Sequence, residues 1–151
     1  MRRGLSSEFL NLNRLDVNTG QCVCSFFSDY PNPPCISACP KDAVYLNPLK
    51  IDPGSCDNCM VCAAVCPTDA LLAGESFFSD TDEAAISTSG DEIEIRCSRI
   101  FVDAVEVPCL GALDVPFLAG LALKSGKDVK LISGDCEGCG MSSGRVLAVK
   151  N

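Results

Sequence analysis

The alternation of apolar and charged residues in the C-terminal half predicts three short strands. Residues 92–96 read Glu-Ile-Glu-Ile-Arg and run into Cys97, which is the period-two pattern of a strand with one buried face. Residues 105–108 (Val-Glu-Val-Pro) and 129–133 (Val-Lys-Leu-Ile-Ser) predict a second and a third strand. Each predicted strand is followed within three residues by a cysteine.

A helix is expected between the second and third of these strands. Asp114 is a suitable N-cap, Pro116 fits the first helical turn, and Gly126 is a suitable C-terminal stop. The apolar face of this helix consists of Phe117, Leu118 and Leu121. Strands that alternate with a helix predict a small α/β unit with parallel strands.

Two polar stretches divide the rest of the sequence. Residues 1–16 predict a short helix or an extended arm, and a partly ordered terminus is the alternative. Residues 76–90 are polar and acidic, with a short helix expected at 83–86, and the domain junction is placed there. The apolar positions of the first stretch are Phe9, Leu10, Leu12 and Leu15. We therefore expect an N-terminal arm (1–16), a cysteine-rich domain (17–77) and a small α/β domain (78–151).

The most specific motif of the sequence lies at residues 56–67. Its cysteines are separated by two, two and three residues, and a proline follows the last: Cys56, Cys59, Cys62 and Cys66-Pro67. This spacing is the bacterial run for iron–sulfur ligation, in which the fourth cysteine ligates a different cluster from the first three. The fourth cysteine is expected to start a helix that points away. A zinc site or a disulfide knot fits the closing Cys-Pro less well.

One such run predicts a second cysteine set, and an altered one lies at residues 20–40. It consists of Cys22, Cys24, Cys35 and Cys39-Pro40, with a ten-residue insertion between the second and third cysteines. We expect the insertion to loop out, because its prolines should not be able to sit in a helix or a central strand. Those prolines are Pro31, Pro33 and Pro34. Phe26, Phe27 and Tyr30 are expected to pack over a cluster, with contact to a partner as the alternative.

The two sets have matching sequels and form an internal repeat of about 27 residues. Cys39-Pro-Lys-Asp-Ala parallels Cys66-Pro-Thr-Asp-Ala. The repeat predicts a cysteine loop, a short helix after Cys-Pro and a short strand. Asp42 and Asp69 would favour the N-terminus of that helix, and the small Ala43 and Ala70 would allow close packing against a cluster.

On these motifs, residues 20–75 resemble a two-cluster bacterial ferredoxin domain of the α+β class. The resemblance implies two [4Fe–4S] clusters with crossed ligation. The ligands implied for the first cluster are Cys56, Cys59, Cys62 and Cys39. Those implied for the second are Cys22, Cys24, Cys35 and Cys66.

The four remaining cysteines are Cys97, Cys109, Cys136 and Cys139. They follow strands, and the carboxyl ends of parallel strands share one edge of a sheet, so we expect them to converge on a third site. Gly134, Gly138 and Gly140 would allow the backbone to approach a cofactor there.

This half resembles, less closely, the small iron–sulfur subunit of methyl-viologen-reducing hydrogenase and heterodisulfide reductase complexes. The matching residues are Pro-Cys-Leu-Gly-Ala-Leu-Asp at 108–114 and Gly-Asp-Cys-x-x-Cys at 134–139. The resemblance implies a thioredoxin-like or Rossmann-like fold and a [2Fe–2S] cluster. The spacing also leaves a [4Fe–4S] cluster, zinc or a redox dithiol open.

Composition narrows the function further. The sequence has twelve cysteines and no histidine, which excludes Rieske ligation, His-containing zinc sites and histidine general-base catalysis. A net charge of −8 argues against nucleic acid as a partner. No signal peptide and no membrane-spanning run is recognisable, so a reducing cytoplasm is expected.

Together these features favour an electron-transfer subunit that relays single electrons through three clusters to or from a larger redox enzyme. No Walker loop and no dinucleotide-binding glycine motif is present. The alternatives are a ferredoxin-linked thiol–disulfide enzyme that uses Cys136 and Cys139, and a ferredoxin with a zinc-stapled docking module.

Overall fold

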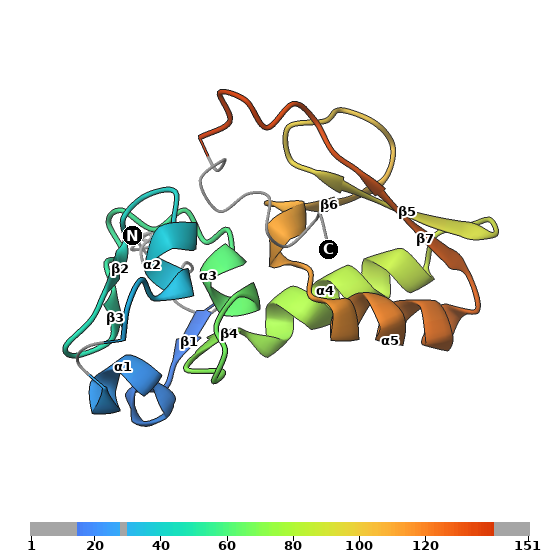
Figure 1. The fold of residues 1–151 in the computed structure, drawn as a ribbon. Coiled ribbons are helices and arrows are strands. Elements are labelled where there is room, and N and C mark those ends of the chain that lie inside the picture. Colours follow the sequence, from blue (N-terminus) through green and yellow to red (C-terminus); the bar gives the residue numbers. More distant parts are fainter. Residues whose placement is uncertain (1–14, 28–29, 141–151) are drawn as a thin grey trace, which may run out of the picture.

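The computed structural model describes residues 15–27 and 30–140. In Figure 1 the cysteine-rich N-terminal half lies on the left, and the C-terminal half, a sheet above two helices, lies on the right. Among the described residues, no helix has both the length and the apolar character needed to cross a membrane.

Two small antiparallel ladders frame the N-terminal half. β1 (Leu15–Val17) pairs with β4 (Leu71–Ala73), so that Leu15 lies opposite Ala73. β2 (Val44–Tyr45) pairs with β3 (Lys50–Ile51). The apolar positions Phe9, Leu10 and Leu12 of the expected arm lie outside the described residues, whereas Leu15 is in a strand and not in a helix.

The helices of this half are single turns: η1 (Thr19–Gln21), α1 (Val23–Phe26), α2 (Pro34–Ala38) and α3 (Val61–Ala64). The expectation of a helix after each Cys-Pro pair was wrong. α2 and α3 instead lie before Cys39 and Cys66, and the segment after each Cys-Pro is a turn. Asp42 and Asp69 have φ of 51° and 53°, in the left-handed region, which is incompatible with a right-handed helix at these positions.

The insertion also differs from the expectation at two points. Pro34 is in a helix, as the first residue of α2, where its missing N–H has no helical acceptor to satisfy. Phe26 and Phe27 do not pack over a cysteine set, because both side chains are exposed.

The C-terminal half contains a parallel three-stranded sheet in the order β6-β5-β7. β5 (Glu92–Cys97) is central, and β6 (Val105–Val107) and β7 (Asp128–Ile132) pair with it in parallel, at the positions expected from the sequence. α5 (Val115–Ser125) connects β6 to β7 across the sheet. Ser98 to Ala104 suffice to connect β5 to β6, because β6 begins opposite Ile95, near the end of β5.

α5 begins and ends as its sequence predicts. The Oδ1 atom of Asp114 accepts a hydrogen bond of 2.7 Å from the backbone N–H of Phe117. Gly126 closes the helix at φ 67°.

The acidic stretch after the cysteine-rich half contains a longer helix than expected. α4 (Glu75–Ile86) spans twelve residues rather than the four expected at 83–86. Its buried side chains Phe77, Thr81 and Ala85 recur every four residues and form a narrow stripe. The Thr81 hydroxyl donates to the Phe77 carbonyl at 2.8 Å, so the polar member of the stripe is satisfied.

α4 and α5 pack side by side under one face of the sheet (Figure 1). The core between them includes Phe77 from α4, Ile93 and Ile95 from β5, and Leu121 from α5. The opposite face of the sheet is charged, with ion pairs that join Lys130 to Glu94 and Arg96 to Glu106.

The two halves share buried contacts through α3 and η2 (Leu110–Ala112). Met60 belongs to the same apolar core as Ile93 and Ile95. A Cβ atom placed at Gly111 would lie 3.5 Å from the Cγ2 atom of Val61, in ordinary van der Waals contact, so η2 packs closely against Val61 of α3 here. The contact brings Cys59, which lies just before α3, close to Cys109 of the other half.

Candidate metal centres

Four cysteines from two separated segments line the first cysteine cavity. They are Cys39, Cys56, Cys59 and Cys62. Cys59 and Cys62 are buried, and the other two are partly buried. Cys39 comes from the first half of the repeat and the other three from the second.

Two residues with a left-handed backbone conformation shape the loop around this cavity. Asn58 and Met60 have φ of 52° and 63°, which turns the backbone sharply between Cys56 and Cys62. The Asn58 N–H donates to the Cys56 sulfur at 3.4 Å. The Ala43 N–H donates to the Cys39 sulfur at 3.3 Å, and Ala43 is fully buried, in keeping with its small size.

The second cysteine cavity is lined by the other four cysteines of the N-terminal half. They are Cys22, Cys24, Cys35 and Cys66. Cys24 lies on α1, Cys35 lies on α2, and Cys66 follows α3. Tyr30 lines this cavity, so of the three aromatic residues expected there only Tyr30 reaches it. The grouping is crossed, because Cys39 and Cys66 each line the cavity of the other half of the repeat.

Burial and mutual repulsion disfavour thiolates in both cavities. Burial, assisted by the neighbouring Cys59 and Cys39, raises the pKa of Cys62 to about 12. Burial likewise raises the pKa of Cys35 to about 11, assisted by Cys66. Four thiolates are therefore compatible with these cavities only when a cation or a cationic metal core compensates their charge.

The residues in both cavities fit an iron–sulfur group. Each provides four thiol donors in an enclosed space, and N–H groups donate to two of the sulfurs of the first. Among the described residues, no group of three or more cysteine, aspartate or glutamate side chains is clustered tightly enough for a single metal ion.

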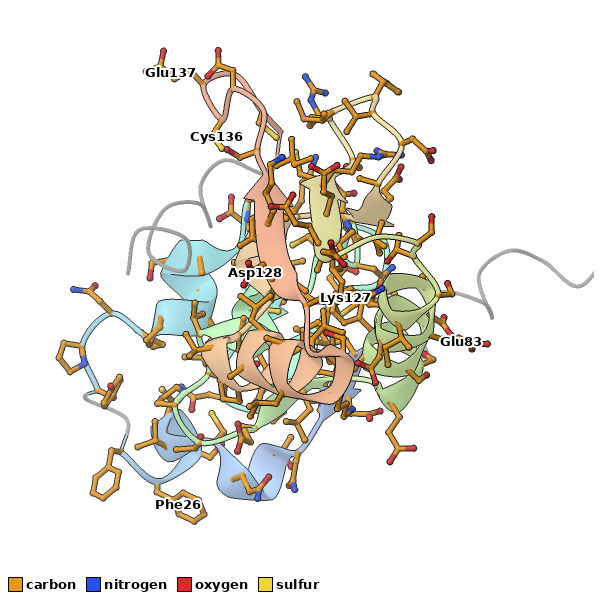
Figure 2. The ribbon with its side chains drawn as sticks, turned by 90° about the vertical axis from the view of Figure 1, so that its right-hand side faces the viewer. Phe26, Glu83, Lys127, Asp128, Cys136 and Glu137 are labelled. Carbon is orange, nitrogen blue, oxygen red and sulfur yellow. The ribbon has the colours of Figure 1, made fainter. Side chains whose placement is uncertain are left out.

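The third group of cysteines lies at the carboxyl edge of the parallel sheet. Cys97 ends β5, Cys109 follows β6, and Cys136 and Cys139 lie in the segment after β7. In Figure 2, Cys136 lies at the far end of β7 from Lys127 and Asp128. Burial raises the pKa of Cys109, and the nearby Cys139, Cys136 and Cys97 raise it further. Cys97, Cys136 and Cys139 therefore each lie near Cys109, although Cys136 is exposed.

Neighbouring sets approach each other at two pairs of thiols. Cys109 packs against the buried cluster that contains Cys59 and Val61. Burial is the largest cause of the raised pKa of Cys59, and Cys109 raises this pKa as well. Cys35 in turn contributes to the raised pKa of Cys62. The first cavity therefore lies next to both the second cavity and the third group.

An ion pair at the first cavity was not foreseen from the sequence. The Lys41 ammonium lies 3.0 Å from an Asp57 carboxylate oxygen, and both residues line the cavity. The sequence offered only one sign of this ion pair, namely that each of its residues closely follows a cysteine. In the second repeat, Thr68 takes the place of Lys41.

The comparisons with known proteins agree with this chemistry. The family model of the 4Fe-4S binding domain matches residues 49–72. A ferredoxin of Alicyclobacillus acidocaldarius subsp. acidocaldarius is 37% identical over 69 residues, which are 44% of this chain and 82% of that protein. This protein belongs to the ferredoxin family.

A second relative of this ferredoxin is the B subunit of the polysulfide reductase of Wolinella succinogenes, 34% identical over 71 residues. The match covers 40% of this chain and 34% of that subunit, so the chain spans about a third of that relative. No solved structure matches. The chain is thus an iron–sulfur protein of the electron-transfer type, with a 4Fe-4S binding region.

Proposed function

We propose that this ferredoxin is an electron-transfer subunit that relays single electrons through two [4Fe–4S] clusters and a third cluster in its C-terminal half. The observation that supports the relay is the order of the three cysteine groups. The first cavity has Cys35 of the second cavity on one side and Cys109 of the third group on the other. A series of closely spaced centres is what one-electron transfer over the length of a molecule requires.

The proposed ligands of the first cluster are Cys39, Cys56, Cys59 and Cys62, and those of the second are Cys22, Cys24, Cys35 and Cys66. The clusters would supply reversible one-electron chemistry. The protein's own task is to bury the sulfurs, exclude water and donate N–H groups to them, as Ala43 does to Cys39.

For the third group, Cys97, Cys109, Cys136 and Cys139 are proposed to hold a [2Fe–2S] cluster, with a [4Fe–4S] cluster as the other form. Their position at the carboxyl edge of a parallel sheet supports a ligand site. A thioredoxin-like domain over residues 78–151 is part of the same proposal. If these cysteines bound zinc instead, this half would be a docking module. If Cys136 and Cys139 formed a redox dithiol, it would be a thiol–disulfide enzyme.

A larger redox enzyme is the proposed partner, in a hetero-oligomeric complex. The polysulfide reductase subunit noted above is, by its name, part of a reductase. A cytoplasmic location is proposed, because twelve cysteines need a reducing compartment before their clusters form.

Metal analysis of anaerobically purified protein tests the number of clusters. With a third [2Fe–2S] cluster we expect about 10 irons per chain, and with a third [4Fe–4S] cluster about 12. About 8 irons with one zinc would favour the docking module, and about 8 irons with a Cys136–Cys139 disulfide would favour the enzyme. Either result would contradict a three-cluster relay.

A further inference from the structure

The Lys41–Asp57 ion pair at the first cavity lies against a third segment of the chain. Its two charged atoms are 3.0 Å apart, and both residues line the cavity. A Cβ atom built at Gly140 would lie 3.8 Å from the Lys41 Nζ atom, so the ammonium also approaches the residue that follows Cys139. The ammonium group of Lys41 therefore lies between the rim of the first cavity and the third cysteine group.

The residues that meet at this ammonium all come from cysteine segments. Each is within two positions of a cysteine assigned to a cluster: Lys41 follows Cys39, Asp57 follows Cys56, and Gly140 follows Cys139. The first two of these cysteines line the first cavity, and the last belongs to the third group. The ammonium thus joins segments of the first and the third site that are far apart in the sequence.

The second cavity has no equivalent charge. Among the described residues that line the two cysteine cavities, Lys41 is the one cation, and those of the second cavity carry no charged side chain. Thr68 lines the second cavity at the position that Lys41 has in the first repeat. The two sites therefore have matching sets of four cysteines but different charges at their rims.

The charge of Lys41 bears on the reduction of the first cluster. A cluster gains one negative charge when it is reduced, so a positive charge held beside it favours the reduced form. The Asp57 carboxylate holds the flexible lysine at the rim and opposes its effect in part. The side chains of Lys41 and Asp57 are 37% and 41% exposed, so water and salt weaken the effect without removing it.

We propose that Lys41 is a positioning residue that holds the segment 136–140 against the first site, and that its charge favours an electron on the first cluster over the second. This role rests on the proposed function, because it concerns the potentials of two proposed clusters. One electron passes from the second cluster, which is oxidised, to the first, which is reduced. The ammonium keeps its proton, and no bond is formed or broken. An electron is thereby drawn to the site next to the third group.

Substitutions of Lys41 in the full holo-protein test both parts of the proposal. Lys41→Thr introduces the residue that the second repeat has at this position, and Lys41→Arg retains the charge. The matched control is Lys124→Thr, which removes the ammonium of another exposed ion pair, 2.9 Å from Asp82, between α5 and α4. Neither Lys124 nor Asp82 lines a cysteine cavity.

Reductive titration followed by proton NMR tests the effect of the charge, since the hyperfine-shifted signals of the cysteine ligands give the reduced fraction of each [4Fe–4S] cluster. At low salt we expect Lys41→Thr to lower the ratio of reduced first cluster to reduced second cluster by about threefold or more. Lys41→Arg and Lys124→Thr should keep the wild-type ratio. High salt should diminish the effect of Lys41→Thr. An unchanged ratio in Lys41→Thr, or an equal change in Lys124→Thr, would overturn the role of the charge.

Hydrogen exchange measured by mass spectrometry tests the positioning of the segment 136–140, whatever the third group binds. Exchange of this segment should be about twofold to fivefold faster in Lys41→Thr than in the wild type, which is the size expected for one exposed charged contact. It should be unchanged in Lys41→Arg. Wild-type exchange in Lys41→Thr would show that Lys41 does not hold the segment.

The two measurements separate the role of Lys41 from the proposed function. Protein that lacks a third cluster but shows the altered ratio and the faster exchange in Lys41→Thr would contradict the three-cluster relay and support the role of Lys41. Protein that contains three clusters but shows neither change would contradict the role of Lys41 and leave the relay intact.

Discussion

Cys39 and Cys66 hold equivalent positions in the two halves of the repeat, and each lines the cavity of the other half. The exchange follows from the local fold. α2 and α3 end just before these cysteines, and the left-handed Asp42 and Asp69 then turn the backbone away. Each of these cysteines is thereby directed to the opposite cavity.

Single serine substitutions at these two positions test the crossing. Cys66→Ser should damage the cluster assigned to Cys22, Cys24 and Cys35, and spare the one assigned to Cys56, Cys59 and Cys62. Cys39→Ser, the matched variant, should have the opposite effect. EPR of the reduced protein, together with its iron content, shows which of the two clusters is lost. If each variant instead lost the cluster whose other ligands are closest in the sequence to the substituted cysteine, the crossing would be refuted. Each variant should retain at least the iron of one intact [4Fe–4S] cluster, about 4 per chain.

For single residues, the cysteines of the N-terminal half could be predicted to form two sites, whereas the positions of the aromatic side chains could not be predicted. The resemblance to a two-cluster ferredoxin, which rests on the spacing and the repeat, implied two groups of four cysteines. The two cavities contain the same groups, and their ligation stays a prediction. The exposure of Phe26 and Phe27 could not be predicted, because sequence alone does not say which side of a one-turn helix faces solvent. The Lys41–Asp57 ion pair joins the two halves of the repeat and was equally hidden.

At the scale of elements, signals at the ends of a helix were more reliable than composition. Asp114, Pro116 and Gly126 fixed the bounds of α5 because each acts locally, through a side-chain hydrogen bond or a backbone preference. α4 was underestimated because its buried stripe is narrow and includes Thr81 among acidic neighbours. The helices after Cys-Pro were wrong because proline tolerates a first helical turn but does not enforce one.

The cap of α5 gives a prediction at this scale. Asp114→Ala removes the acceptor of the Phe117 N–H and should lower the free energy of unfolding by about 1 kcal/mol. Asp114→Asn retains an acceptor oxygen and should remain within a few tenths of a kcal/mol of the wild type. Urea unfolding followed by circular dichroism measures both. Equal losses in the two variants would mean that the charge, and not the cap, stabilises the helix.

At the scale of the molecule, the contact between the halves decides what the protein can do. Met60 and Val61 are buried between α3 and η2, and Cys59 packs near Cys109. The sequence placed a polar junction at 76–90 but gave no sign of this contact, because Gly111 and Val61 are far apart in the sequence and neither is unusual alone. A relay through all three groups depends on it.

The position of the first cavity between the other two groups predicts that its cluster is indispensable for internal transfer. Cys62→Ser should remove that cluster and leave the second and third ones assembled, because neither uses Cys62 as a ligand. Electrons delivered to one end of the molecule would then redistribute to the other much more slowly than in the wild type. Pulse reduction followed by rapid-freeze EPR measures the redistribution. Leu123→Ser, which changes an exposed side chain of α5 that lines neither cysteine cavity, is the control for general damage. Wild-type rates in a Cys62→Ser protein that lacks the first cluster would show that the second and third sites communicate directly, and the linear order would then be wrong.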